Sequence, residues 1–383
     1  MKNPFETPER AALRDSFTRF VNAEIKPNVD EWDEAGAVPW ELHEKVGNFG
    51  LWGLGIDEEF GGVGFDVPFM RAMFSELISG CGASGVGAAV GGRSLSIGPL
   101  AKFAPDDFRR EVLPEIIAGR VSSSLAITEP GGGSDVAAMT TKAERRGNGW
   151  RISGAKTFIT GAMESDWFVV GARTGEGGLK GISLFMVPAN TKGFDRVALE
   201  KKQGWWCSNQ ASLHFDECDL PAEALIGPEN AGFIAIMNNF NYERLSMIAG
   251  MLGMMKCCYE AALDYSRERK TFGKRLIDHQ VIAHKFAEMS SRIDAVEAYL
   301  NQICWSLDLG DMPVAEISKG KFFTSKQLEY VTSEAMQVFG GAAYMRGNVA
   351  ERAWRELKVQ AIGGGSEEIM RDLAVRQMGL AAP

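Results

Sequence analysis

A long run of apolar residues, spaced alternately by three and four positions, most strongly constrains how this chain folds. The run consists of Phe286, Met289, Ile293, Val296, Leu300, Ile303 and Leu307. Because an α-helix has about 3.6 residues per turn, this spacing places all of these side chains on one face, as in a helix of a bundle. Further helices are predicted over residues 231–268, 314–339 and 366–378, so residues 229–383 are expected to form a four-helix bundle.

Residues 1–120 are also predicted to be helical. Thr7 and Pro8 suit an N-cap and a first-turn proline, and apolar residues follow them at helical spacing. Further along, residues 80–92 read GCGASGVGAAVGG. Glycine destabilises helices, so its abundance there indicates that a neighbouring backbone or a ligand approaches closely.

Residues 121–228 show the pattern of a β domain. SSLAITE alternates in polarity, GNG at residues 147–149 is typical of a hairpin, and short β-rich runs follow at residues 166–173 and 181–188. Short strands and glycine-rich turns predict a small barrel or sandwich. The fold class is therefore α+β, with a β domain between two helical ones.

Composition excludes several classes of function. The balance of 45% apolar and 24% charged residues is that of a globular protein, and the formal net charge of −9 opposes binding of nucleic acid. No CxxC or HExxH pattern is present, so no metal site is expected. The absence of a secretion signal and of an apolar stretch of about 20 residues predicts a cytoplasmic protein without membrane insertion.

Several short segments carry groups that suit ligand binding. Residues 127–136 read ITEPGGGSDV, residues 268–274 read ERKTFGK and are followed by DHQ at 278–280, residues 337–341 read QVFGG, and residues 361–371 read AIGGGSEEIMR. Exposed backbone N–H groups in glycine-rich turns suit phosphate or heterocycle carbonyls. A basic cluster at a helix end can bind a pyrophosphate or simply offset the helix dipole. Taken singly, each segment is as well explained by a turn or a cap.

Together, in this order and spacing, the segments closely resemble the acyl-CoA dehydrogenase family over essentially the whole chain. The resemblance implies an N-terminal helical domain (1–120), a middle β-barrel (121–228) and a C-terminal four-helix bundle (229–383). It also implies FAD as the cofactor and a homotetramer built as a dimer of dimers.

Residue roles follow from the same resemblance. The residues that it places beside the flavin ring and the thioester are Thr128, Ser134, Phe158 and Thr160. It also implies a set of residues that bind the adenine-diphosphate arm of FAD, part of which a second subunit supplies. This set consists of Arg269, Phe272, Gln280, Gln337 and Gly341. Along the cofactor it places Ser366 and Glu368. The expected substrate contacts are Gly91, Arg93, Ser134, Arg244 and Gly365.

The catalytic base is expected at Glu243. Most family members carry this carboxylate at the position occupied here by Gly364, whereas the long-chain and isovaleryl branches, which this chain resembles, supply it from the first long bundle helix. Glu243 lies at the edge of an apolar helical face with Ile236, Phe240 and Met247. Desolvation there should raise its pKa above about 4.3, toward the range that suits a general base. The Gly364 N–H is expected to stabilise charge on the thioester oxygen.

The implied reaction removes the α-proton of an acyl-CoA and transfers a hydride from the β-carbon to the flavin, giving a trans-2-enoyl-CoA. Electrons then pass to an electron-transferring flavoprotein. A same-fold acyl-CoA oxidase or desulfinase, or a non-catalytic flavin- or CoA-binding homologue, remains as the alternative. Gly91 is expected to widen the acyl pocket, and Arg93 is expected beside CoA, beside a polar acyl group or in a structural ion pair.

Overall fold

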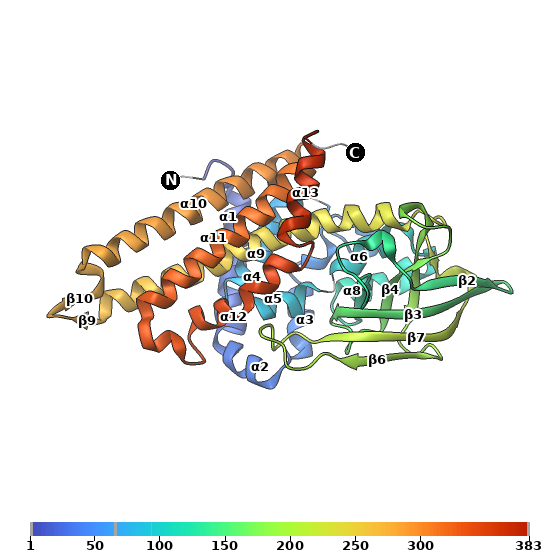
Figure 1. The fold of residues 1–383 in the computed structure, drawn as a ribbon, viewed down its shortest axis with the longest axis horizontal. Helices are drawn as coiled ribbons and strands as arrows, with labels where there is room; N and C mark the ends of the chain where they lie inside the picture. The colour runs from blue at the N-terminus through green and yellow to red at the C-terminus, as the bar shows by residue number, and fades with distance from the viewer. Residues whose placement is uncertain (1–2, 65–66, 93, 381–383) are drawn as a thin grey trace.

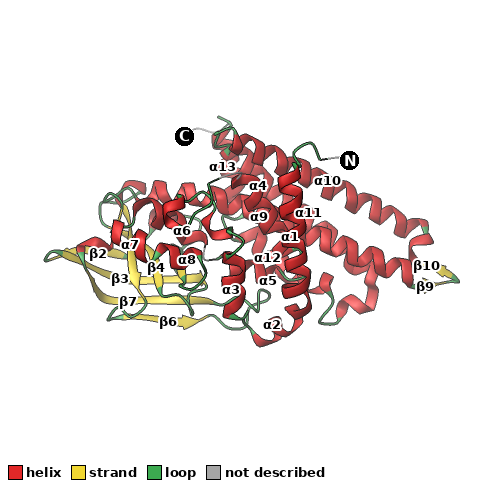
Figure 2. Ribbon diagram, turned by 180° about the vertical axis from the view of Figure 1, so that it is seen from behind, coloured by secondary structure: helices red, strands yellow, loops and turns green. Residues whose placement is uncertain are grey.

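The computed structural model describes residues 3–64, 67–92 and 94–380. It shows a β-sheet at one end of an elongated molecule and a helical bundle at the other, with the N-terminal helices packed between and against them (Figures 1 and 2). This is the α+β arrangement that the sequence predicted. No helix among the described residues is both long and apolar enough to cross a membrane.

The N-terminal region is helical, as expected. Thr7 caps the first helix, since its side chain accepts a hydrogen bond from the Arg10 amide, and Pro8 occupies the first turn. The α-helices of this region are α1 Pro8–Phe20, α2 Val29–Ala35, α3 Trp40–Gly47, α4 Val67–Ser79, α5 Ser84–Gly91, α6 Ser94–Phe103, α7 Asp106–Glu111 and α8 Leu113–Ile117. A short π-helix, Val21–Ile25, extends the first of them.

The glycine-rich segment forms α5 and the turn before it, and its glycines permit close contacts. A Cβ on Gly80 would lie 3.2 Å from the Gly253 carbonyl oxygen of α9, and one on Gly85 would lie 2.9 Å from the Cys207 sulfur. At Gly91, by contrast, a Cβ would have no neighbour within 4 Å. Neighbouring chain segments therefore account for the first two glycines, as predicted.

The middle region forms one eight-stranded sheet. Its strands are β1 Ser123–Ala126, β2 Lys142–Arg146, β3 Gly149–Thr160, β4 Trp167–Arg173, β5 Ile182–Pro188, β6 Phe194–Ala198, β7 Gln210–Leu220 and β8 Leu225–Ile226. Their order is β6-β7-β3-β2-β4-β5-β8, with β1 parallel to β4. The hydrogen-bonded path among the described strands is thus an open one, from β6 to β8. Gly147, with a φ of 58°, lies in the predicted hairpin between β2 and β3.

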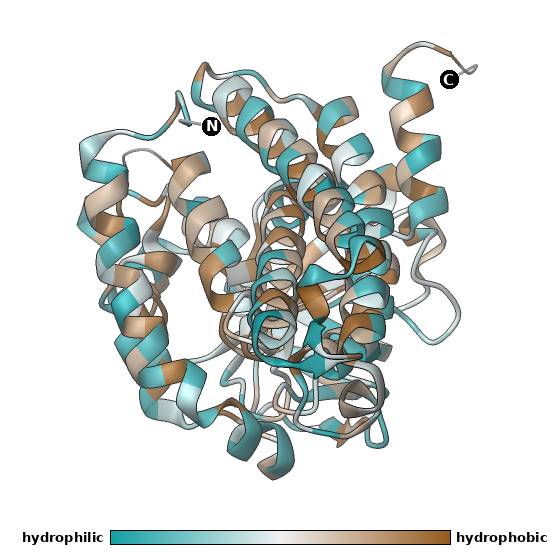
Figure 3. Cartoon of the chain, turned by 90° about the vertical axis from the view of Figure 1, so that its left-hand side faces the viewer, coloured by the Kyte–Doolittle hydropathy of each residue, from teal (hydrophilic) through white to brown (hydrophobic). Residues whose placement is uncertain are grey.

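The C-terminal region contains the predicted bundle. Its helices are α9 Gly232–Glu268, α10 Gln280–Asp308, α11 Val314–Phe339, α12 Val349–Ile362 and α13 Glu367–Gln377, with a small hairpin of β9 Lys270–Thr271 and β10 Lys274–Arg275. All seven apolar residues of the opening run are buried on α10. Brown and teal residues intermix along these helices in Figure 3, as expected where only one face enters the core.

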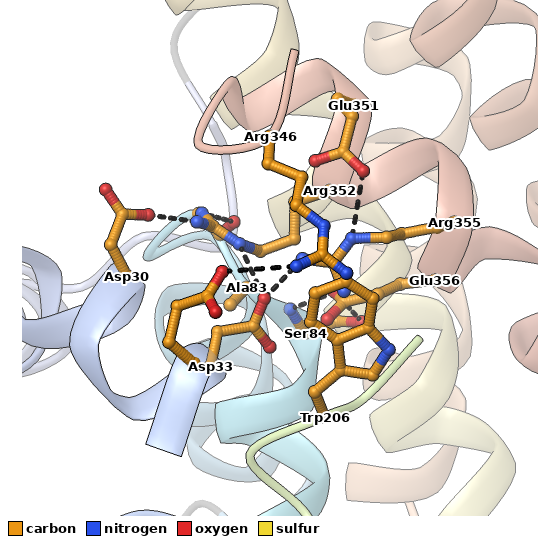
Figure 4. A network of polar contacts seen from close by, with 12 residues as sticks. Asp30, Asp33, Ala83, Ser84, Trp206, Arg346, Glu351, Arg352, Arg355 and Glu356 are labelled. Carbon is orange, nitrogen blue, oxygen red and sulfur yellow. Dashed lines mark hydrogen bonds and ion pairs between the residues drawn. The ribbon is translucent and has the colours of Figure 1, made fainter. Parts of the chain in front are cut away.

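Helix α12 was missed by the sequence analysis, and half of the residues on its buried face are polar. Arg352 and Glu356 are 4% and 0% exposed and share that face with Gln360. The apolar residues that remain on this face include two alanines, which give only a weak signal of helical periodicity. Arg352 and Glu356 belong to a polar network that joins α12 to the N-terminal helices (Figure 4).

Candidate active site

A cavity of about 1830 Å³ opens where the N-terminal helices, the sheet and α9 meet. A pocket for one drug-sized ligand usually measures about 300–1,000 Å³, so this cavity has room for more than one. Nine of the predicted site residues line it: Gly91, Thr128, Ser134, Phe158, Thr160, Glu243, Gly364, Gly365 and Ser366.

One wall of the cavity is formed by strand β3. Phe158 lies at an irregularity between Lys156 and Ile159 in the β3–β7 pairing, with a φ of 58° and a side chain that is 69% exposed. Positive φ is strained for a bulky residue, and such strain is concentrated at functional sites. The irregularity thus presents an aromatic ring to the cavity.

The glycine-rich loop 130–134 is held by Glu129, which the sequence analysis did not single out. Its carboxylate accepts hydrogen bonds from Thr140, from the Thr141 amide (2.8 Å) and from the Lys156 ammonium (2.9 Å). Burial opposes ionisation, but Lys156 and the two threonines lower the pKa of Glu129 to about 2. A Cβ at Gly131 or Gly132 would meet nothing within 4 Å. Hydrogen bonds to Glu129 therefore anchor the start of the loop, while the space around Gly131 and Gly132 is free.

Glu243 projects into the cavity from α9. Its Oε2 atom is buried, and neither carboxylate oxygen accepts a hydrogen bond from a described residue. Burial raises the pKa of Glu243 to about 6, although the positive charges of Arg244 and Lys321 act against the increase. The direction agrees with the sequence-based prediction, and burial is the cause that was expected.

The carboxylate of Glu243 lies in the space that a side chain at position 364 would enter. A Cβ built on Gly364 would lie 3.7 Å from Glu243 Oε1 and 2.6 Å from the Met247 sulfur. Gly364 has a φ of 64°, so both its conformation and its surroundings favour glycine. The Glu243 side chain, which projects from α9, therefore reaches the space beside residue 364.

The loop that contains Gly364 is fixed by two cations. Arg244 Nε donates to the Gly364 carbonyl (3.0 Å), and the buried Lys321 donates to that of Gly365. In the described part of the chain, the Gly364 N–H has no acceptor. Arg244 was expected to contact substrate, but it is buried beneath this loop, also donates to Asn241 Oδ1 and does not line the cavity. Its placement is that of a positioning residue.

Other predicted site residues lie away from the cavity. Exposed residues near the opposite end of the bundle include Arg269, Phe272, Gln280, Gln337 and Gly341, and Phe272 is 98% exposed. Tyr265 and Phe339, whose rings lie 4.9 Å apart, bring the two chain segments that carry this set together. Glu368 is exposed on α13 and does not line the cavity either, and Arg93 lies outside the described residues.

The length of α9 separates the cavity residues around Glu243 from the exposed set around Arg269. Glu243 and Arg269 are 26 positions apart along α9 and its C-cap, which corresponds to about 39 Å at 1.5 Å per residue. A ligand beside Glu243 in this protomer is therefore far from Arg269. The family resemblance assigned part of this set to the cofactor of a second subunit, and that assignment stays a prediction.

Comparison with known proteins gives consistent matches along the chain. Family profiles for the acyl-CoA dehydrogenase N-terminal, middle and C-terminal domains match residues 7–120, 124–218 and 230–379. The mitochondrial long-chain specific acyl-CoA dehydrogenase of Rattus norvegicus is 33% identical over 97% of this chain and 86% of its own length.

Solved structures agree in fold. A probable acyl-CoA dehydrogenase from Mycobacterium abscessus has a TM-score of 0.94 and 37% identity, covering 97% of this chain and 99% of that one. A glutaryl-CoA dehydrogenase from Mycobacterium smegmatis, solved in complex with FADH2, has a TM-score of 0.92 and 25% identity, covering 98% and 96%. The chain therefore belongs to the acyl-CoA dehydrogenase family.

Proposed function

We propose that this protein is an FAD-dependent enzyme that converts an acyl-CoA thioester to the trans-2-enoyl-CoA, with Glu243 as the base and an electron-transferring flavoprotein as the acceptor. The observation that carries the proposal is the position of Glu243. A buried carboxylate without a partner, with a pKa of about 6, lies beside the Gly364 backbone in a large cavity. A general base needs a pKa near the working pH and a free acceptor oxygen.

The cavity residues fit a flavin. Phe158 offers an exposed aromatic ring, the 130–134 loop offers open backbone, and the hydroxyls of Thr128, Ser134 and Thr160 line the same space. The relative solved with FADH2 supports the assignment. When bound, FAD would supply the hydride acceptor for the β-carbon.

The residues of this chain would handle the proton and the developing negative charge. Glu243 takes the α-proton, and the Gly364 N–H donates a hydrogen bond to the thioester oxygen, where negative charge accumulates. Arg244 and Lys321 hold the carbonyls of Gly364 and Gly365, so this donor is oriented before substrate arrives. Substrate burial would exclude water from Glu243 and strengthen each of these interactions.

The exposed set at the opposite end of the bundle would serve a second subunit. Arg269, Phe272, Gln280, Gln337 and Gly341 are too far from this protomer's cavity to contact a ligand there. Exposed aromatic and cationic groups in one cluster suit contact with the diphosphate and adenine of a neighbouring protomer's FAD. We infer a homotetramer, a dimer of dimers, in which such contacts complete each cofactor site.

The proposed function is tested by the flavin spectrum of the purified protein. We expect bound FAD that is bleached anaerobically by a saturated acyl-CoA, with an enoyl-CoA as the product, and reoxidised by electron-transferring flavoprotein. Rapid oxygen consumption would instead indicate an acyl-CoA oxidase, and sulfite release from a sulfinoacyl-CoA would indicate a desulfinase. Protein that retains FAD but is bleached by no acyl-CoA would contradict the proposal.

The rate of flavin reduction should depend on pH through Glu243. Because burial raises the pKa of this carboxyl to about 6, the ionised base is lost as pH falls through 6. We expect kcat/KM for flavin reduction to fall about tenfold per pH unit below 6 and to level off above about 7. Stopped-flow absorbance between pH 5 and 8.5 measures this. A flat profile over that range would contradict the assignment.

Gly91 should limit the length of the acyl group when it is enlarged. It lines the cavity, and a Cβ there would have no neighbour within 4 Å, so we expect the fold to tolerate Gly91→Leu. The leucine would occupy volume otherwise open to substrate. We expect a shift of the preferred saturated acyl-CoA to shorter chains, measured as kcat/KM across a series from four to sixteen carbons. An unchanged profile would show that the acyl group does not extend to Gly91.

A further inference from the structure

Helices α4 and α9 place an unusual group of polar side chains in the cavity wall. The group consists of Arg71, Ser75 and Ser79 on α4, spaced by four residues, with Tyr242 and Ser246 on α9. Residues four apart lie on one face of a helix, so the α4 residues form a continuous polar stripe. None of their side-chain hydroxyls makes a hydrogen bond with a described residue. An acyl pocket for a plain hydrocarbon chain would not need such a stripe.

Arg71 is the charged member of this group, and its charge is not neutralised. Its Nη2 donates a 3.3 Å hydrogen bond to the Leu54 carbonyl, its guanidinium carbon lies 5.4 Å from the Tyr242 ring centre, and its buried Nε has no acceptor. No carboxylate of the described chain lies within ion-pair distance of Arg71. Burial lowers the pKa of Arg71, as expected for a buried cation that no carboxylate neutralises. A desolvated cation without a counter-charge is costly, and a ligand carboxylate would remove that cost.

The position of Arg71 favours the acyl group over CoA as the source of that negative charge. Arg71 lies 5.4 Å from the Tyr242 ring centre and lines the same cavity as Glu243, the proposed base at the α-carbon. The CoA phosphates are separated from the thioester by the whole pantetheine arm. An anion that shares this cavity with the reacting carbons, without the length of the pantetheine arm, would be one carried on the acyl chain.

We propose that Arg71, assisted by the hydroxyls of Tyr242 and Ser75, binds a carboxylate at the far end of the acyl group, so that the substrate is an ω-carboxyacyl-CoA. This inference rests on the proposed dehydrogenase function. The planar guanidinium can donate two parallel hydrogen bonds to a carboxylate, and the hydroxyls donate to its remaining lone pairs. An uncharged chain of equal length would leave Arg71 buried beside methyl groups and would be disfavoured.

The test compares matched thioesters on the purified FAD enzyme. Glutaryl-, adipyl-, pimelyl- and suberyl-CoA are each paired with the unsubstituted acyl-CoA of the same carbon number, and kcat/KM for flavin reduction is measured. We expect at least one dicarboxylic thioester to exceed its partner by about 30-fold or more. Arg71→Met should abolish that preference by lowering kcat/KM for the dicarboxylic substrate alone, and Tyr242→Phe should reduce it in part.

Arg110→Met is the matched control. It removes an equal charge from an exposed ion pair with Glu59, outside the cavity, and should leave both members of each pair unchanged. The proposal is overturned if no dicarboxylic thioester is preferred by the wild-type enzyme. It is also overturned if Arg71→Met lowers both members of a pair equally, because Arg71 would then serve CoA or the fold. If no thioester reduces the flavin, the dehydrogenase function itself fails instead.

Discussion

Glu243→Gln is expected to retain yellow, FAD-bound protein and to lose flavin bleaching by acyl-CoA. Glutamine has nearly the same volume as glutamate, so the cavity beside Gly364 keeps its shape, but no group remains that can take the α-proton. Loss of a general base costs on the order of 10³-fold in rate, or about 4 kcal/mol in the barrier. Anaerobic stopped-flow absorbance of the flavin measures the effect directly.

Glu260→Gln provides the control for this result. Glu260 lies on the same helix, α9, but is exposed and away from the cavity. Its replacement should leave the bleaching rate unchanged within a factor of about two, since surface substitutions rarely affect packing. Bleaching by Glu243→Gln at the wild-type rate would exclude Glu243 from the mechanism. Loss of bound FAD in this variant would instead give the carboxylate a structural role.

Local sequence patterns were sufficient for most of the architecture. The run on α10 identified a buried helical face, and Thr7 with Pro8 identified a helix start, because both depend on near neighbours in the chain. The resemblance to a family also placed Glu243 in the cavity. Helix α12 was missed because burial of Arg352 depends on acidic residues more than 300 positions earlier.

The remaining features of the site depend on tertiary contacts that no local pattern encodes. Glu129 anchors its loop through Lys156, which lies on a different strand. Arg244 is adjacent to the proposed base, yet it turns beneath residue 364 instead of toward the cavity. Arg71 stands out only once the structure shows that no carboxylate has been brought to it. Sequence reasoning cannot tell which charged residues acquire a partner in the fold and which do not.

Arg352→Met should destabilise the protein by about 3–5 kcal/mol, since it breaks a buried ion-pair network. Arg352 is 4% exposed, donates to Asp30, to Asp33 (3.3 Å) and to the Gly82 carbonyl (3.1 Å), and thereby joins α12 to α2 and to the turn before α5 (Figure 4). Its loss leaves the buried Asp33 with Arg355 as its remaining cation, although one Asp33 oxygen already lacks a partner. Urea unfolding followed by circular dichroism measures the change.

Two further variants separate charge from packing in this network. Arg346→Met removes an arginine that lies over Trp206 (4.2 Å from the ring centre) and pairs with the exposed Glu34, so its cost should stay below about 1 kcal/mol. Adding Asp33→Asn to Arg352→Met removes the uncompensated carboxylate and should restore part of the lost stability. If the double variant were as unstable as the sum of the single ones, the ion pair would not be what joins these helices.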